Sequence, residues 1–306
     1  MGLQEIAVDH ALTVAAQEQN WRDFYEQAWA ARATFMRALI ADGETNPYRI
    51  IKLLERQERQ FRIIKGAEGV TWEKLPWPKE LSQTPAGTPA FRIASFRGEN
   101  LVVPFYASDN LHKFIVDYIA ETGPYDGIVE LGCGYGRNLF EIFFNGGPRE
   151  VPYFGGELTA SGVAIASELA ALEPRLRASF FRFDHLKPDI RALPKMKRAL
   201  LFTMHSLEQV KFIPPDFFLA ISRAAAEVAC LHFEPFGYQV ANLGPASEAH
   251  HQFAVEMGWN QNFAASLAEA TQRFGLKTSF IATELFLPLA ADNPTSLAIW
   301  HSSAKP

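Results

Sequence analysis

The chain has 306 residues, of which 48% are hydrophobic and 21% charged, a composition that is typical of globular proteins and excludes an intrinsically disordered chain. Its net charge of -5 provides no general attraction to a phosphate backbone or an anionic membrane, so we expect no nucleic-acid partner. Only Cys133 and Cys230 occur, and neither a secretion signal nor a membrane-spanning apolar run is found, so the sequence predicts a cytoplasmic protein without a disulfide framework.

The N-terminal region is predicted to be mostly helical. Apolar and aromatic residues recur at helical spacings between residues 3 and 40, which is the pattern of an amphipathic helix. A second helix is predicted over residues 48–64, after the helix-breaking pair Asn46-Pro47. No chemical motif lies in either segment. We therefore interpret residues 1–88 as a helical cap or an oligomerisation surface, which would suit a homodimer.

A proline-rich connection over residues 75–89 separates this region from the rest of the chain. Its prolines exclude a regular helix, so we predict a domain boundary there and a second domain over residues 89–306. Apolar runs at residues 91–96 and 101–105 predict a short hairpin around residues 98–100. A helix is expected next, from residue 109 to residue 120.

From residue 125 onward, short apolar runs alternate with helical stretches, which is the pattern of repeated strand–helix units and a parallel sheet. Two later apolar runs, residues 276–287 and 295–302, are separated by a turn that begins and ends with proline and should pair as an antiparallel hairpin. The sequence therefore predicts a doubly wound α/β domain. The runs that we predict as its parallel strands are residues 127–131, 153–157, 179–184, 199–204 and 228–233.

The first of these strands ends in a glycine-rich turn, Gly132-Cys133-Gly134-Tyr135-Gly136, which leads into a helix. Glycine is needed where the backbone takes a positive φ or where a ligand approaches closely, and the helix start offers N–H groups to that ligand. The third glycine comes one residue too early for the dinucleotide fingerprint G-x-G-x-x-G, and the turn lacks the lysine of a P-loop. The spacing therefore favours a ligand other than a nicotinamide dinucleotide.

Two acids follow at the ends of the second and third predicted strands. Glu157 stands where an acid accepts hydrogen bonds from ribose hydroxyls in this fold class. Its alternative role is to cap the next helix, which Thr159 or Ser161 could do instead. Asp184 could accept a hydrogen bond from the exocyclic amine of adenine, or it could be a solvated loop residue.

Together these features resemble the class I S-adenosylmethionine-dependent methyltransferases over roughly residues 108–303. The resemblance rests on residues 129–136 as the first motif of that family, on the acids Glu157 and Asp184, and on the terminal hairpin. It implies a seven-stranded sheet of order 3-2-1-4-5-7-6 with an antiparallel last strand, and S-adenosylmethionine bound at the ends of the first three strands. S-Adenosylhomocysteine would be the product. The cofactor-binding residues that it implies, with Glu130 near the amino group of the cofactor, are Glu130, Gly132, Gly134, Gly136, Asn138, Glu157, Asp184 and His205.

Substrate chemistry is expected at the ends of the fourth and fifth predicted strands. Methyl transfer needs alignment of the acceptor and, for an O–H or N–H group, a base that takes its proton. His205 is the predicted general base, and Glu208 and Glu234 are predicted to bind a cationic or hydroxylated substrate. The alternative for each is hydrogen bonding that only shapes the loops. His232 lies nearby in the sequence, but no spacing typical of metal ligands occurs, so no metal site is predicted.

Two segments are expected to cover this pocket. Residues 244–275 are longer than a plain crossover, and Trp21, Tyr25 and Trp29 of the N-terminal helix could close over the site. The sequence therefore predicts a methyltransferase that acts on an O or N atom of a small-molecule substrate. The alternatives are an NAD(P)-dependent oxidoreductase and a catalytically silent, methyltransferase-like binding module.

Overall fold

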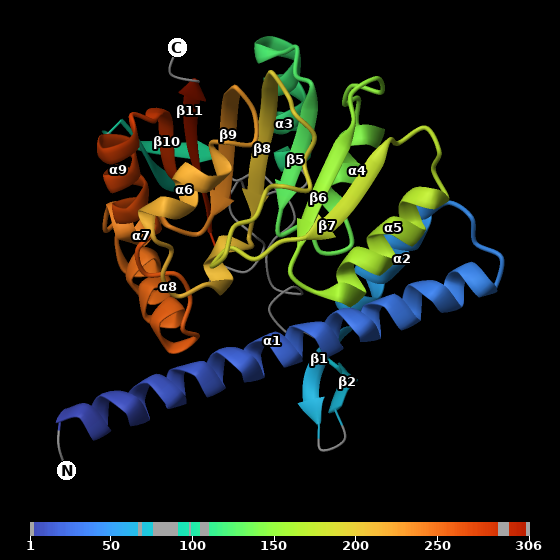
Figure 1. Ribbon diagram of the computed structural model, residues 1–306, viewed down its shortest axis with the longest axis horizontal. Helices are drawn as coiled ribbons and strands as arrows, with labels where there is room; N and C mark the ends of the chain where they lie inside the picture. The colour runs from blue at the N-terminus through green and yellow to red at the C-terminus, as the bar shows by residue number, and fades with distance from the viewer. Residues whose placement is uncertain are drawn as a thin grey trace.

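The computed structural model describes residues 3–66, 69–75, 91–97, 99–104, 110–286 and 294–303. Its strands form a two-stranded sheet, β1-β2, and a nine-stranded sheet of order β4-β3-β10-β11-β9-β8-β5-β6-β7. Helices cover both faces of the large sheet, and the long helix α1 (Leu3–Ala41) crosses one end of it (Figure 1). The predicted proline-rich connection, apart from Leu75, lies outside the described residues, as do residue 98 of the first hairpin and residues 288–293 of the second.

Five parallel strands form the centre of the large sheet, and each coincides closely with a predicted apolar run. Every residue of the first two is buried, as expected for strands that are covered on both faces. Parallel pairing brings the carboxyl ends of all five to one edge, where the candidate site residues lie. The five strands are β5 (Gly127–Leu131), β6 (Tyr153–Glu157), β7 (Ala178–Arg182), β8 (Arg198–Met204) and β9 (Glu227–Glu234).

The C-terminal strands β10 (Lys277–Phe286) and β11 (Thr295–Ser303) pair antiparallel as predicted, and β11 lies antiparallel between β10 and β9. The order β7-β6-β5-β8-β9-β11-β10 therefore contains the expected arrangement 3-2-1-4-5-7-6. The prediction of seven strands is wrong, because the hairpin β3 (Phe91–Phe96) and β4 (Glu99–Pro104) joins β10 and extends the sheet to nine. This pairing covers backbone groups of β10 that would otherwise form an open edge.

Helices enclose a hydrophobic core on each face of the sheet. One core is built with side chains of α2 (Pro47–Glu58), α3 (Asn110–Thr122), α4 (Arg137–Phe144) and α5 (Ala160–Ala171). The other contains side chains of α6 (Pro215–Ile221) and α9 (Phe263–Phe274). Figure 1 shows α7 (Gly237–Val240) and α8 (Pro245–Glu256) on the carboxyl side of the strands. The segment predicted as a cover thus divides into α8 at this edge and α9 on the sheet.

The N-terminal region is less helical than predicted. Helix α2 ends at Glu58, and the residues after it form an antiparallel hairpin of β1 (Phe61–Gly66) and β2 (Gly69–Lys74). Aromatic and β-branched residues make up half of each strand, and this composition favours extended backbone over helix. Helix α1 contacts α2, β2 and α5, so it bridges the N-terminal hairpin and the helix that follows β6.

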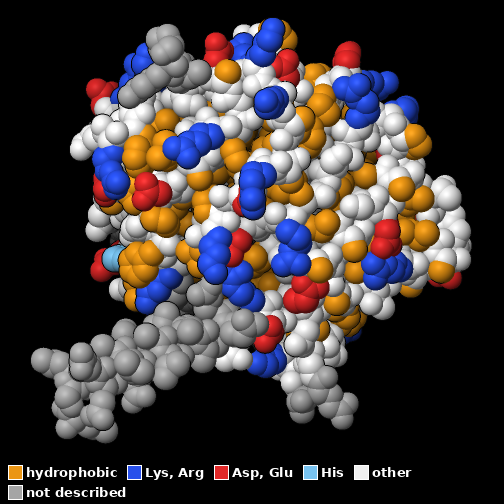
Figure 2. Space-filling model, viewed as in Figure 1, with side chains coloured by type: hydrophobic (Ala, Val, Ile, Leu, Met, Phe, Trp, Pro, Cys, Tyr) orange, Lys and Arg blue, Asp and Glu red, His pale blue; other side chains and the backbone are white. Residues whose placement is uncertain are grey.

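The surface seen in Figure 2 carries acidic and basic side chains interspersed with apolar ones. Charges of opposite sign are therefore mixed on this face rather than gathered into separate acidic and basic areas. Within the ranges that the structure describes, no helix has the length and apolarity needed to span a membrane.

Candidate functional site

The glycine-rich turn between β5 and α4 is the centre of the candidate site. Gly132, Gly134 and Gly136 have φ angles of +84°, +55° and +82°, a region that residues with side chains rarely adopt. The N–H groups of Gly132 and Cys133 donate to the carbonyl oxygen of Gly156 at 2.7 and 3.0 Å. These two bonds hold the turn against β6.

The indole of Trp29 on α1 lies directly on Gly134. A Cβ atom placed on Gly134 would come within 2.5 Å of the indole carbon Cη2, so this approach requires glycine. Trp29 also packs edge-on against Tyr135, with 5.6 Å between ring centroids, and the Arg32 guanidinium lies 4.8 Å from its ring centroid. A ligand that uses the same backbone surface must therefore displace Trp29.

Two hollows open around this indole, and Trp29, Gly132 and His205 line both of them. The first, which we call the aromatic hollow, has a volume of about 120 Å³. The second, the arginine hollow, has a volume of about 410 Å³. Other residues of the aromatic hollow include Trp21, Tyr25, Glu157, Phe183, His185 and Gln209, and those of the arginine hollow include Arg32, Glu58, His112, Cys133, Arg137 and Asn138. Three of the aromatic residues of α1, Trp21, Tyr25 and Trp29, thus line the aromatic hollow.

Glu157 ends β6 beside the turn and is only 5% exposed. Its Oε2 accepts a hydrogen bond from the Gly134 N–H at 2.9 Å, and its Oε1 accepts from both the N–H and the hydroxyl of Thr159 at 2.8 Å. Burial raises the pKa of Glu157, and these hydrogen bonds oppose that rise. Thr159 is the N-cap of α5, because its hydroxyl oxygen accepts from the Gly162 N–H. Glu157 is therefore not the N-cap residue.

A chain of polar side chains runs from Glu130 to the arginine hollow. Asn138 Nδ2 donates to Glu130 Oε1 at 2.5 Å, and Asn138 Oδ1 lies 2.7 Å from His112 Nε2. Glu130 Oε2 is buried and has no hydrogen-bond partner among the described residues. Burial raises the pKa of Glu130 to about 8 and lowers that of His112. An unsatisfied oxygen of the Glu130 carboxyl group is thus held close to the glycine-rich turn.

Asp184, which stands between the lining residues Phe183 and His185, pairs with α1. Its Oδ2 accepts from Arg22 Nη2 at 2.8 Å, and its Oδ1 accepts from the Leu186 N–H at 2.9 Å. Two further contacts fix α1 nearby: the Tyr25 hydroxyl donates to Gln209 Oε1, and Glu26 accepts from the N–H groups at the start of α5. Polar contacts therefore anchor α1 along the carboxyl edge of the sheet.

His205 follows β8 with a φ of +50°, a strained conformation for a residue other than glycine. Its Nδ1 lies 3.0 Å from Glu208 Oε2, and its Nε2 lies 2.7 Å from Thr295 Oγ1. Burial alone would lower the pKa of His205, but the charge of Glu208 and its hydrogen bond raise the pKa above the usual value. This raised pKa suits a residue that accepts a proton.

Glu234 ends β9 and carries a buried carboxylate. It accepts hydrogen bonds from the N–H groups of Ser206, Leu207 and Glu208 at 3.1–3.3 Å, which caps the short helix η2 (Leu207–Gln209). Burial and the charge of Glu208 raise the pKa of Glu234 to about 7. His205, Glu208 and Glu234 are therefore brought together as predicted, with Glu234 occupied in holding the loop that carries the other two.

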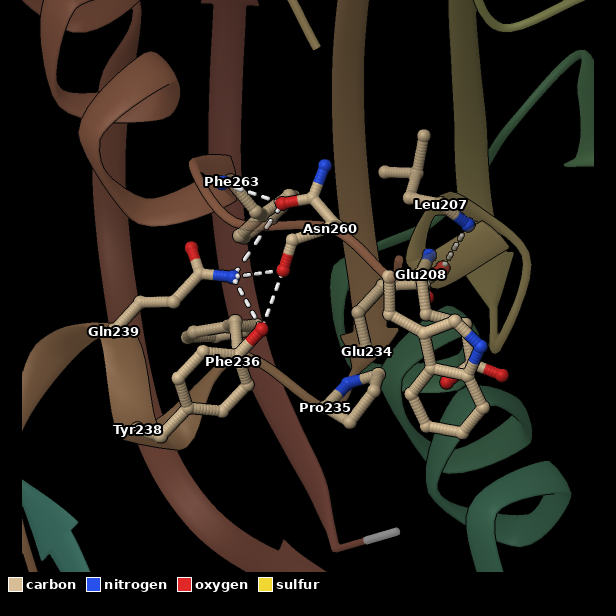
Figure 3. Close-up of a pocket in the computed structure, with 10 residues that line it drawn as sticks. Leu207, Glu208, Glu234, Pro235, Phe236, Tyr238, Gln239, Asn260 and Phe263 are labelled. Atoms are coloured by element: carbon tan, nitrogen blue, oxygen red, sulfur yellow. Dashed lines mark hydrogen bonds between the residues drawn. The ribbon is translucent and has the colours of Figure 1, made fainter. Parts of the chain in front are cut away.

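A small pocket lies beside Glu208 and Glu234 (Figure 3). Figure 3 shows Tyr238 and Gln239 of α7 facing Asn260 across from the two acids. The side chain of Asn260 binds backbone groups of its own surroundings: Nδ2 donates to the Val210 carbonyl, and Oδ1 accepts from the Phe263 N–H. Asn260 therefore shapes the cover of the pocket.

Sequence reasoning missed His112 and Thr295, which contact the site but stand far along the chain from the residues that they meet, because only the packing of α3 and β11 brings them to this edge. It also missed His185, although this residue directly follows the predicted Asp184 at the end of the third parallel strand. In the described part of the chain, no three His, Cys, Asp or Glu side chains are grouped so that they could hold a metal ion.

No protein-family model matches the chain, and no curated protein matches it. Solved structures of methyltransferases do align with it. The magnesium protoporphyrin IX methyltransferase of Synechocystis PCC 6803, with bound S-adenosylhomocysteine, is 12% identical over 64% of this chain and 83% of that one, with a TM-score of 0.45.

Two further similar structures come from Streptomyces. The geranyl diphosphate C-methyltransferase of Streptomyces coelicolor A3(2) is 16% identical over 63% of this chain and 77% of that one, with a TM-score of 0.42. A methyltransferase of Streptomyces caelestis is 15% identical over 65% of this chain and 91% of that one, with a TM-score of 0.43. Similarities of this size identify neither an activity nor a substrate.

Proposed function

We propose that the chain is a methyltransferase that binds S-adenosylmethionine at the carboxyl edge of the large sheet and methylates an O or N atom of a small molecule. The cofactor would lie across the ends of β5, β6 and β7. In this proposal α1 and the hairpin β1-β2 act as a cap over that edge. The division at residue 88 then separates the cap from the catalytic domain.

One observation carries the proposal: two buried carboxylates flank the glycine-rich turn at the ends of adjacent strands. Among the described residues Glu130 Oε2 has no hydrogen-bond partner, and a bound ammonium group would satisfy it and favour the ionised form of the carboxyl group. Glu157 retains a lone pair on Oε2, since each carboxylate oxygen can accept two hydrogen bonds and Oε2 accepts only one, whereas Oε1 already accepts two. A ligand with an amino group at one end and a hydroxyl group near its middle matches this pair.

The residues of the chain fit S-adenosylmethionine once the Trp29 side chain leaves its position on Gly134. The backbone surface that glycine leaves open at Gly134 is in contact with the indole. A nucleoside in the aromatic hollow and an amino acid in the arginine hollow would be joined across this point. Cofactor binding therefore requires the Trp29 side chain to move and some of the contacts of α1 to break.

The bound cofactor would supply an electrophilic methyl group on a sulfonium. His205 would then act as the base. Hydrogen bonding of its Nδ1 to Glu208 fixes the proton on Nδ1, which leaves Nε2 as the acceptor. An O–H or N–H group of the substrate would replace the Thr295 hydroxyl at Nε2. As the new bond to the methyl carbon forms and the carbon–sulfur bond breaks, the substrate proton passes to Nε2.

Glu208 and Glu234 would assist in different ways. Glu208 orients His205 and stabilises its protonated form, because their side chains lie in direct contact. Glu234 fixes the backbone of residues 206–208. The two acids together also favour a substrate that carries a positive charge or hydroxyl groups.

A transfer assay tests this proposal. The purified chain is incubated with S-adenosylmethionine labelled in its methyl group and with a cell extract, whose small molecules, proteins and nucleic acids are then separated. We expect label in a small molecule, and at least about a hundredfold less with His205→Ala, whose binding of S-adenosylhomocysteine should be unchanged. Label in protein or nucleic acid, or no transfer at all, would contradict the proposed function.

A further inference from the structure

His185 lines the aromatic hollow but has no role in the chemistry described above. It follows β7 in the chain and is 9% exposed. Its ring packs edge-on against Phe183 and Phe217, with centroid distances of 5.3 and 5.7 Å. Its Nε2 faces the glycine-rich turn, since a Cβ on Gly132 would come within 3.0 Å of that atom.

Neither ring nitrogen of His185 has a hydrogen-bond partner among the residues that the structure describes. His232 shows what a satisfied buried histidine looks like in the same protein. Its Nδ1 lies 2.9 Å from Thr203 Oγ1, and its Nε2 accepts from Trp300 Nε1 at 2.9 Å. Buried polar atoms without partners are rare and costly, so a partner from outside the chain is the simplest explanation for His185.

The protonation state of His185 narrows the chemistry of that partner. Burial among aromatic rings lowers the pKa of His185 to about 4, so the imidazole is neutral at physiological pH. A neutral imidazole presents one N–H donor and one acceptor nitrogen. The other lining residues near it, including Trp21 and Phe183, provide flat apolar surfaces. A heteroaromatic ring with an acceptor nitrogen fits both features.

We propose that His185 is a specificity-determining residue whose N–H donates a hydrogen bond to a ring nitrogen of the purine of the methyl donor. The assignment rests on the proposed function, because it takes the aromatic hollow as the nucleoside pocket. Glu157 lines the same hollow, so the ribose and the purine would be neighbours there. His185 would thereby select a purine over a base that lacks the acceptor nitrogen.

The variant His185→Phe separates this role from a structural one. Phenylalanine fits among Phe183 and Phe217 and removes two unsatisfied polar atoms, so we expect the melting temperature to stay the same or rise. The affinity for S-adenosylhomocysteine should nevertheless fall about tenfold, the effect of one buried hydrogen bond. His185→Gln, which retains a donor, should recover part of that loss.

The matched control is His232→Phe. Because it leaves Trp300 Nε1 and Thr203 without their partner, we expect the melting temperature to fall while the dissociation constant stays at the wild-type value. The two histidine variants should therefore show opposite patterns of stability and binding.

Calorimetric titration with S-adenosylhomocysteine and its 1-, 3- and 7-deaza analogues provides the direct test. In the wild type, one of the three analogues should bind about tenfold more weakly than the parent compound, and in His185→Phe this difference should vanish. If His185→Phe binds S-adenosylhomocysteine with wild-type affinity, or if the difference between the parent compound and the analogue persists in the variant, the role of His185 is refuted while the proposed function stands. Absence of S-adenosylhomocysteine binding by the wild type would overturn the proposed function and this assignment together.

Discussion

Replacement of Trp29 by alanine should tighten cofactor binding and lower the free energy of unfolding. The indole covers Gly134, packs against Tyr135 and contacts the Arg32 guanidinium. An aromatic pair contributes about 0.5–1.5 kcal/mol and an exposed cation–π contact about 0.5–1 kcal/mol. Displacing the indole therefore costs about 1.5 kcal/mol of the binding free energy.

That cost corresponds to a binding-competent fraction of about one tenth, so Trp29→Ala should lower the dissociation constant for S-adenosylhomocysteine about tenfold. The free energy of unfolding should fall by about 1–2 kcal/mol, less than for a fully buried tryptophan. Isothermal titration calorimetry and denaturant unfolding measure the two effects. Trp21→Ala is the matched control, because Trp21 lines the same hollow without covering Gly134, and it should not tighten binding. Unchanged or weaker binding by Trp29→Ala would refute the displacement of the indole.

Three further predictions follow from the buried ionisable groups. Glu157→Ala should weaken S-adenosylhomocysteine binding more than about tenfold, because a charged acceptor of a ribose hydroxyl is lost, and calorimetry checks this. In the wild type the rate of methyl transfer should rise with pH as the His205 imidazole loses its proton. The midpoint of this rise should lie above the usual pKa of histidine because Glu208 raises the pKa of His205, and a pH–rate profile checks this. Glu130 has a folded-state pKa of about 8, above its unfolded value, so it is protonated at neutral pH only in the folded state. Its contribution to the free energy of unfolding is complete below the unfolded pKa near 4.5 and is lost as the pH rises through the folded pKa of about 8. Between these two pKa values the free energy of unfolding falls by up to about 1.4 kcal/mol per pH unit. Urea unfolding at several pH values should therefore show a weaker decline in Glu130→Gln, although Glu234 titrates in the same window and leaves some decline in the variant.

The large sheet could be predicted from the sequence because its strands are local patterns. The apolar runs of β5 to β9 and the positions of Glu130, Glu157 and Asp184 at strand ends follow from chain order alone. The addition of β3 and β4 could not be predicted, since the pairing of Ala282 with Phe96 joins segments that are far apart in the chain. A hairpin is visible in the sequence, but its partner strand is not.

The site was predictable only where its residues follow a strand directly. The glycine-rich turn and the grouping of His205, Glu208 and Glu234 were foreseen in this way. Contacts that α1 makes with Gly134 and Asp184 were not, although its aromatic residues were expected near the pocket. Those contacts depend on where a 39-residue helix crosses the sheet, and helical periodicity determines a face but not a docking position.

The most direct test of the central claim is calorimetric titration of the purified chain with S-adenosylhomocysteine and, separately, with NAD and NADP. We predict binding of S-adenosylhomocysteine with a dissociation constant on the order of micromolar, and no binding of either nicotinamide nucleotide. Binding of NAD or NADP in place of S-adenosylhomocysteine would contradict the assignment of the cofactor. If the chain binds none of these three ligands, the interpretation of the carboxyl edge of the sheet as a cofactor site is contradicted.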